Sequence, residues 1–173
     1  ADKAEIELVE IKDIPVFNKP ANKQVPETIL EIASKIEEAD GVIIGTPEYD
    51  HSIPAVLMSA LAWLSYGIYP LLSKPVMITG ASYGTLGSSR AQLQLRQILN
   101  SPEIKATVLP DEFLLSHSLQ AFDQNGDLVD LDVIKKLDAI FDDFRIFVKV
   151  TEKLRNAQEL LRKDAEDFDW ENL

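Results

Sequence analysis

The sequence contains no cysteine. This absence excludes disulfide bonds, thiolate nucleophiles, cysteine-ligated zinc and cysteine-ligated iron–sulfur clusters. Basic residues are also scarce, because 17 Lys and Arg stand against 29 Asp and Glu, giving a formal net charge of −12. A nucleic acid would meet a repulsive field at such a surface, so the composition speaks against nucleic-acid binding.

A long hydrophobic run is missing as well. The longest nearly continuous apolar stretch, residues 53–64, is shorter than the roughly 20 residues that a membrane-spanning helix needs. The acidic beginning of the chain does not have the pattern of a secretory signal. We therefore expect no membrane insertion and a cytoplasmic location.

The length and the overall composition are those of a globular protein. The 173 residues suit a single domain, and 46% hydrophobic with 27% charged residues is close to the average for soluble folds. A disordered or fibrous chain is not expected from these values. The sequence predicts one domain over residues 1–163, followed by an acidic tail over residues 164–173.

Segments typical of strands alternate with segments typical of helices. Short runs of β-branched and apolar residues predict strands at residues 6–11, 41–45, 76–79 and 106–109. Apolar residues at helical spacing predict helices at residues 27–38, 88–99 and from 134 onward, and another to residue 64 that Ser52 could cap. Residues 118–130 predict a small excursion with a turn at Asn125-Gly126. This alternation implies an α/β fold: a doubly wound parallel sheet in a three-layer α/β/α sandwich.

Two polar loops follow the two central predicted strands. Residues 46–52 combine a proline, two carboxylates, a phenol and an imidazole, and residues 80–87 contain three glycines among hydroxyl side chains. Ligands of such sheets bind beyond the carboxyl ends of the strands, where both loops would lie. The glycine spacing matches neither the dinucleotide fingerprint nor the Walker loop.

A serine esterase is one alternative interpretation of the second loop. Residues 80–84 fit the G-x-S-x-G nucleophile elbow, with Ser82 as the nucleophile. An elbow turns directly into its helix, whereas here further loop residues intervene up to Gly87. The only downstream histidine, His117, lies six residues after Asp111, which is an awkward source of both the base and its orienting acid.

The sequence predicts no metal site. Its two histidines, His51 and His117, would need carboxylate partners from separate loops to hold zinc. The acidic segment that starts at Asp123 differs from a calcium loop, because Leu128 stands at the sixth position and Ile134 at the twelfth.

Residues 45–57, GTPEYDHSIPAVL, with AWLS at residues 62–65, resemble the NADPH-dependent FMN reductase family of flavodoxin-like proteins. The resemblance continues through residues 74–76, 86–87, 90–92, 95–96 and 108–110. It covers roughly residues 41–130 and is more specific than either loop alone.

The resemblance implies a flavodoxin-like fold, bound FMN, and a flavin ring held between the two loops. The implied cofactor-binding residues are Pro47, Glu48, Tyr49 and Asp50 on one side, and Ser82, Tyr83, Gly84 and Gly87 on the other. Asp50 stands where the family usually has Asn, and an ionised carboxylate cannot donate a hydrogen bond. Family members begin with a strand and a phosphate loop that have no counterpart here. The FMN phosphate is therefore assigned to no residue, and we expect the chain to be a fragment.

The implied function is NAD(P)H-dependent reduction of FMN, with electrons passed on to a small-molecule acceptor such as a flavin, a quinone or an azo compound. The cofactor carries this chemistry, so no dedicated catalytic residue is expected. Arg90 and Arg96 could supply local positive charge, although solvated helix arginines are the simpler interpretation. A homodimer or homotetramer is expected, and Trp63, Tyr66 and Tyr69 could cap the core or line a subunit interface. The remaining alternative is an FMN-binding electron carrier without NAD(P)H activity.

Overall fold

The computed structural model describes residues 4–166 of the chain, with side chains up to residue 159. Its elements are α1 (Glu27–Glu38), β1 (Val42–Pro47), α2 (Ala55–Leu64), β2 (Pro75–Ala81), α3 (Ser89–Leu99), β3 (Thr107–Val108), β4 (Phe113–Leu115), the short 3₁₀ helix η1 (Ser118–Gln120) and α4 (Leu131–Glu166). Most of the predicted helices and strands are present. The predicted acidic tail lies mainly outside the described residues.

All strand pairs of the sheet are parallel. β2 is the central strand, with β1 along one edge and both β3 and β4 along the other. β1 aligns with β2 over its whole length, from Val42 opposite Val76 to Pro47 opposite Ala81. The carboxyl ends of the strands therefore lie together, as the prediction of a parallel sheet requires.

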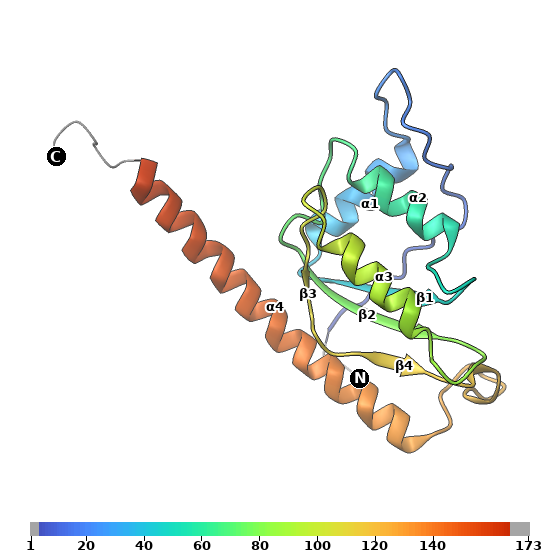
Figure 1. Cartoon of the computed structure of the whole chain (residues 1–173). Helices are drawn as coiled ribbons and strands as arrows, with labels where there is room; N and C mark the ends of the chain where they lie inside the picture. The colour runs from blue at the N-terminus through green and yellow to red at the C-terminus, as the bar shows by residue number, and fades with distance from the viewer. Residues whose placement is uncertain (1–3, 167–173) are drawn as a thin grey trace.

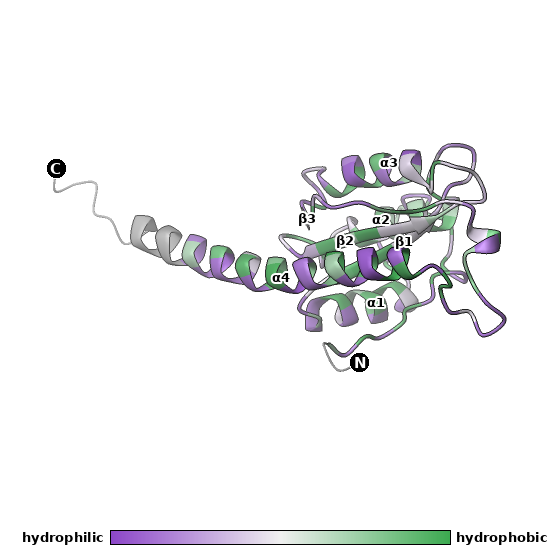
Figure 2. Ribbon diagram, turned by 90° about the horizontal axis from the view of Figure 1, so that it is seen from below, coloured by the Kyte–Doolittle hydropathy of each residue, from purple (hydrophilic) through white to green (hydrophobic). Residues whose placement is uncertain are grey.

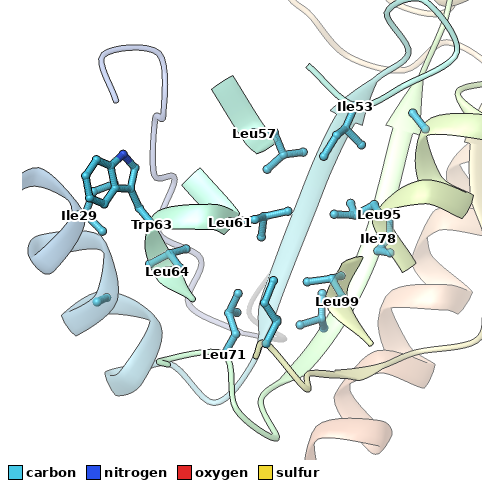
Figure 3. Close-up of a cluster of buried hydrophobic side chains, with 14 residues drawn as sticks. Ile29, Ile53, Leu57, Leu61, Trp63, Leu64, Leu71, Ile78, Leu95 and Leu99 are labelled. Carbon is cyan, nitrogen blue, oxygen red and sulfur yellow. The ribbon is translucent and has the colours of Figure 1, made fainter. Parts of the chain in front are cut away.

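Helices cover the two faces of the sheet. The helices α1, α2 and α3 lie on one face, whereas α4 crosses the other (Figures 1 and 2). Side chains of β2 alternate between the faces, because Val76 and Ile78 join the core under α1 to α3 and Met77 joins the core under α4. Figure 3 shows the first of these cores, in which Leu95 and Leu99 pack against Ile78. The α/β/α layering predicted from the sequence is confirmed.

The strands β3 and β4 are two short pieces along the same edge of β2. Thr107 and Val108 pair with the beginning of β2, and Phe113 to Leu115 pair with its end. Between them the chain leaves the ladder at Pro110, which has no N–H to donate. The guanidinium of Arg96 donates to the carbonyl oxygens of Leu109 and Asp111, both at 2.7 Å. Arg96 is thus a structural clamp rather than a solvated helix arginine.

Two local predictions were wrong. Residues 6–11 form no strand and have no regular secondary structure, with Ile6 69% and Leu8 86% exposed. An alternating pattern gives strand propensity, but this segment has no neighbouring strand with which to pair. Ser52 does not cap α2, because Pro54 precedes its first residue and the Ser52 hydroxyl donates to Gln94 Oε1 at 2.7 Å.

The structure shows what becomes of the turn predicted in residues 118–130 and of the aromatic residues Trp63 and Tyr69. The predicted turn is present, with Gly126 at φ +87° and a bridge between Phe122 and Leu128. Trp63 is buried, and its Nε1 donates to the carbonyl of Pro15 at 2.8 Å, so it caps the core under the N-terminal segment. Tyr69 remains exposed. No helix among the described residues is long and apolar enough to cross a membrane.

Candidate functional site

The two predicted loops lie at one edge of the sheet. Pro47 at the end of β1 pairs with Ala81 at the end of β2, which pairs in turn with Leu115 at the end of β4. The segments that follow these residues therefore begin side by side. This is the edge at which parallel α/β sheets bind ligands.

The first loop, residues 48–52, is a tight turn. Tyr49 and Ser52 exchange two backbone hydrogen bonds, of 3.0 and 2.8 Å. Asp50 and His51 occupy the turn with φ of 48° and 63°, and this left-handed pair is typical of a type I′ turn. The backbone thus projects both side chains from an exposed tip, and Tyr49 is 62% exposed.

Glu48 joins the first loop to the beginning of α3. Its Oε2 accepts hydrogen bonds from the backbone N–H groups of Arg90 at 3.0 Å and Ala91 at 3.4 Å. Its Oε1 lies 3.4 Å from the Arg90 guanidinium, and the Glu48 side chain is only 10% exposed. A carboxylate here accepts hydrogen bonds from N–H groups that have no partner within the helix. Its negative charge is also stabilised by the positive end of the helix dipole. Glu48 therefore fixes the loop in place.

The second loop, residues 82–88, is held by the segment after β4. Ser82 N donates to the carbonyl of Leu115 and Ser118 N donates to the carbonyl of Ser82, both at 3.0 Å. His117 N donates to the carbonyl of Gly84 at 3.1 Å, and Ser116 Oγ donates to that of Thr85 at 2.6 Å. Residues 115–118 therefore form a third wall of the edge. None of the motifs in the sequence predicts this wall.

Gly80 at the end of β2 and the two glycines of the second loop have different surroundings. A Cβ on Gly80 would collide with Ser88 Oγ and with the carbonyl oxygen of Thr46. Gly87 has φ +56°, and a Cβ there would lie 2.7 Å from the carbonyl carbon of Leu114. At Gly84 a Cβ would meet nothing within 4 Å. Packing thus requires Gly80 and Gly87, whereas Gly84 has free space beside it.

The backbone of the second loop offers unused hydrogen-bond donors. Within the described part of the chain, the N–H groups of the exposed residues 83–86 donate to no acceptor. The ring edge of a flavin carries carbonyl oxygens and ring nitrogens that accept hydrogen bonds, and its planar faces need a surface without projecting side chains. Free N–H groups beside an open Gly84 meet both needs. The residues present therefore fit an isoalloxazine ring.

The structure brings the eight predicted cofactor-binding residues to one edge but in two kinds of place. Exposed or half-exposed positions are held by Pro47, Tyr49, Asp50, Ser82, Tyr83 and Gly84. Glu48 and Gly87 instead contact the protein itself. Tyr83 is 74% exposed, which makes it the most exposed aromatic side chain of the edge.

The geometry around Ser82 differs from that of a nucleophile elbow. Its hydroxyl donates to the carbonyl of Gly84 at 3.4 Å, and no hydrogen bond joins it to an imidazole among the described residues. The helix that follows begins only at Ser89. A serine nucleophile needs a base within hydrogen-bond reach, so this arrangement does not support an esterase.

Buried polar residues that no motif predicts lie behind the second loop. Ser88 and Gln92 are both fully buried, and Gln92 Nε2 donates to Ser88 Oγ at 3.1 Å and to the carbonyl of Phe113 at 2.9 Å. Gln94 Oε1 accepts from Ile53 N at 2.9 Å as well as from Ser52. The sequence does contain a signal for this role, because Gln92 stands at a core-facing position of an amphipathic helix. A polar side chain at such a position is normally held by hydrogen bonds.

Two cavities lie elsewhere in the described chain. One of about 140 Å³ lies between the end of α1 and α4, and one of about 260 Å³ lies between the N-terminal segment and α1. Lys74 lines the first and donates to the carbonyls of Glu37 and Ala39; burial and the nearby Arg155 charge lower its pKa. Residues 4–159 contain no group of acidic or histidine side chains able to hold a metal ion.

Comparison with known proteins shows the family of the chain. The family model for NADPH-dependent FMN reductase matches residues 1–120. The chain is 49% identical over 170 residues to the NADH:(hydroxy)cinnamate reductase subunit CrdA of Vibrio ruber, covering 98% of this chain and 84% of the relative. It is 46% identical over 158 residues to NADH-dependent flavin reductase subunit 2 of Lactobacillus johnsonii, covering 88% and 85%.

A solved structure extends the agreement to the fold. FerB, a flavoenzyme NAD(P)H:(acceptor) oxidoreductase from Paracoccus denitrificans, superposes with a TM-score of 0.71 at 29% identity, covering 86% of this chain and 81% of FerB. The parallel sheet, the loop edge and the sequence matches lead to one assignment. The chain belongs to the NADPH-dependent FMN reductase family and is an NAD(P)H-dependent flavin oxidoreductase.

Proposed function

We propose that the chain binds the flavin ring of FMN across the edge formed by residues 47–52, 82–88 and 115–118. The observation that carries this proposal is the row of unused N–H groups at the exposed residues 83–86 beside the open Gly84. Donors held by the fold need no reorganisation when an acceptor arrives, which favours binding of a planar ligand with acceptor atoms along its edge.

The eight predicted residues have two roles in this proposal. Tyr49, Asp50, Tyr83 and Gly84 lie exposed and would contact the ring or the substrate above it. Pro47 and Ser82 continue the paired ends of β1 and β2 and set the width of the edge. Glu48 and Gly87 hold the two loops in shape, through α3 and Leu114 respectively.

When bound, FMN supplies the redox chemistry, taking a hydride from NAD(P)H and passing electrons to a second acceptor. The residues of the edge orient the ring and leave one face open to both substrates in turn. Named relatives include a quinone reductase of Escherichia coli and the flavin reductase subunit above, which supports a quinone or a flavin as acceptor. No side chain of the edge needs to act as an acid, a base or a nucleophile.

The experiment is an FMN titration of the natural full-length protein followed by quenching of flavin fluorescence. Tyr83→Ala should weaken FMN binding without changing the thermal midpoint, because Tyr83 is 74% exposed. The matched control is Tyr69→Ala, which removes an exposed tyrosine from the opposite end of the sheet. Equal effects of both variants, or no saturable binding by the wild type, would refute the proposed site.

Two further measurements distinguish a reductase from an electron carrier and from a serine esterase. Catalytic oxidation of NADH or NADPH in excess over bound FMN identifies a reductase, whereas a stoichiometric reaction identifies an electron carrier. Ser82→Ala should leave flavin reduction largely intact, and it abolishes ester hydrolysis only if Ser82 is a nucleophile.

The assembly, the location and the domain limits remain predictions. Exposed Tyr49, Tyr83 and Leu86 leave an apolar rim at the edge, which a homodimer or homotetramer would cover. Sedimentation velocity of the purified protein tests this expectation. A cytoplasmic location is supported by the use of NAD(P)H, and residues 1–163 are proposed as one domain before the acidic tail.

A further inference from the structure

The helix α4 extends well beyond the sheet that it covers. It packs against β2 and β4, and its last buried residue is Thr151; residues 152–159 are all exposed. A helix of 36 residues is about 54 Å long, so its C-terminal part projects from the body, as both views show (Figures 1 and 2). Most helical stability in proteins comes from packing of an apolar face. A projecting helix therefore gains stability when another element covers it.

One face of α4 carries apolar side chains that begin on the packed part and continue into the projecting part. Ile146, Val150, Leu154 and Ala157 are four, four and three residues apart, the spacing of a single helical stripe. The first three are 61%, 57% and 54% exposed, and Ala157 is exposed as well. This set is called the α4 stripe below. Exposed apolar side chains in a continuous row are typical of an interaction surface.

One edge of the α4 stripe is basic. Lys149 and Lys153 each precede a stripe residue and lie four residues apart, so they share one edge. Among residues 4–159, no ion pair reaches either lysine. Four of the five charged residues in 145–155 are basic, although the chain as a whole has a net charge of −12. Arg145 pairs with Asp142 and Arg155 lies on the opposite face, so the positive charge beside the stripe is that of the two lysines.

We propose that the α4 stripe and its lysine edge dock an acidic amphipathic helix of a different protein. The apolar side chains of that helix would cover Val150 and Leu154, and its carboxylates would face Lys149 and Lys153. Complementary charge of this kind selects the partner and its orientation. The proposal rests on α4 alone and does not depend on flavin reduction.

The charges disfavour a second copy and a membrane as the occupant. In a symmetric antiparallel pair the same edges meet, so Lys149 and Lys153 would face the lysines of the other copy. The net charge of −12 opposes approach to an anionic lipid surface.

The test uses the full-length protein and two labelled helical peptides. Both peptides carry leucine at their a and d positions, but one has Glu at the flanking positions and the other has Lys. Binding is followed by fluorescence anisotropy at about 0.1 M salt. The variants are Leu154→Glu on the stripe, Lys153→Glu on its edge and Arg155→Glu on the opposite face. The last variant matches the second in its change of net charge, and circular dichroism checks that all three are folded.

The proposal expects the Glu peptide to bind at least about tenfold more tightly than the Lys peptide. Leu154→Glu and Lys153→Glu should each weaken this binding by about tenfold, and Arg155→Glu by less than about twofold. Equal binding of both peptides, or equal loss in all three variants, would overturn it. So would dimerisation in sedimentation velocity, or binding to anionic phospholipid vesicles, that Leu154→Glu abolishes, because the occupant would then be a second copy or a membrane.

Discussion

The two glycines of the second loop, Gly84 and Gly87, should respond differently to alanine. Gly87 has φ +56°, and a Cβ there would lie 2.7 Å from the carbonyl carbon of Leu114 and 2.9 Å from Leu115 N. The left-handed backbone costs alanine about 1 to 2 kcal/mol, and overpacking adds about 1 to 3 kcal/mol. We expect Gly87→Ala to lower the free energy of unfolding by about 2 to 4 kcal/mol. This is a large share of the about 5 to 15 kcal/mol by which proteins are stable.

Gly84→Ala should behave in the opposite way. Its φ is not left-handed and its Cβ would meet no atom within 4 Å, so stability should change by less than about 0.5 kcal/mol. If the flavin ring lies against Gly84, however, the added methyl group occupies its space. FMN affinity should then fall by about tenfold, in line with an overpacking cost of about 1 to 3 kcal/mol.

Urea unfolding followed by circular dichroism measures the first quantity, and FMN titration of the folded variants measures the second. The midpoint of unfolding should fall in Gly87→Ala with an unchanged m-value. The reasoning fails if Gly84→Ala destabilises the protein as much as Gly87→Ala does. It also fails if Gly84→Ala binds FMN as tightly as the wild type, because the ring then lies elsewhere.

Three further outcomes are expected for charged side chains that hydrogen-bond to the backbone, two at the site and one away from it. Glu48→Gln should destabilise the protein by about 1 kcal/mol, since a neutral amide loses the attraction to the α3 dipole and to Arg90; a double-mutant cycle with Arg90→Met isolates the pair. Arg96→Met should lower the free energy of unfolding, measured in urea, by about 2 to 3 kcal/mol, because the carbonyls of Leu109 and Asp111 lose a charged donor. Arg96→Lys should restore less than half of this loss. Because burial lowers the pKa of Lys74 below 10.5, the unfolded chain binds more protons just below that pH. Wild-type stability should therefore rise with pH there relative to Lys74→Met, and parallel pH profiles would contradict this assignment.

The sequence predicted helices better than strands for a physical reason. The pattern of residues 27–38 matches α1 at both ends, because helical hydrogen bonds are local and apolar periodicity reports the buried face directly. A strand exists only beside a partner. Residues 6–11 have the alternation of a strand but no neighbour, whereas β4 has only the residues Phe113 to Leu115 and exists because the end of β2 pairs with it. A single sequence contains no signal for either outcome.

The sequence predicted where the candidate site lies. It did not predict which residues hold the loops in place and which are exposed to a ligand. The motif places Glu48 next to Tyr49 and suggests one shared role, yet the carboxylate of Glu48 contacts residues 42 and 43 positions later in the chain. Tyr49, one position further, remains 62% exposed. Neighbouring residues of an extended segment point to opposite sides, so a motif at a strand end mixes residues that build the edge with residues that face the ligand. Alanine at Tyr49 should therefore affect flavin binding before stability, and alanine at Glu48 should affect both together.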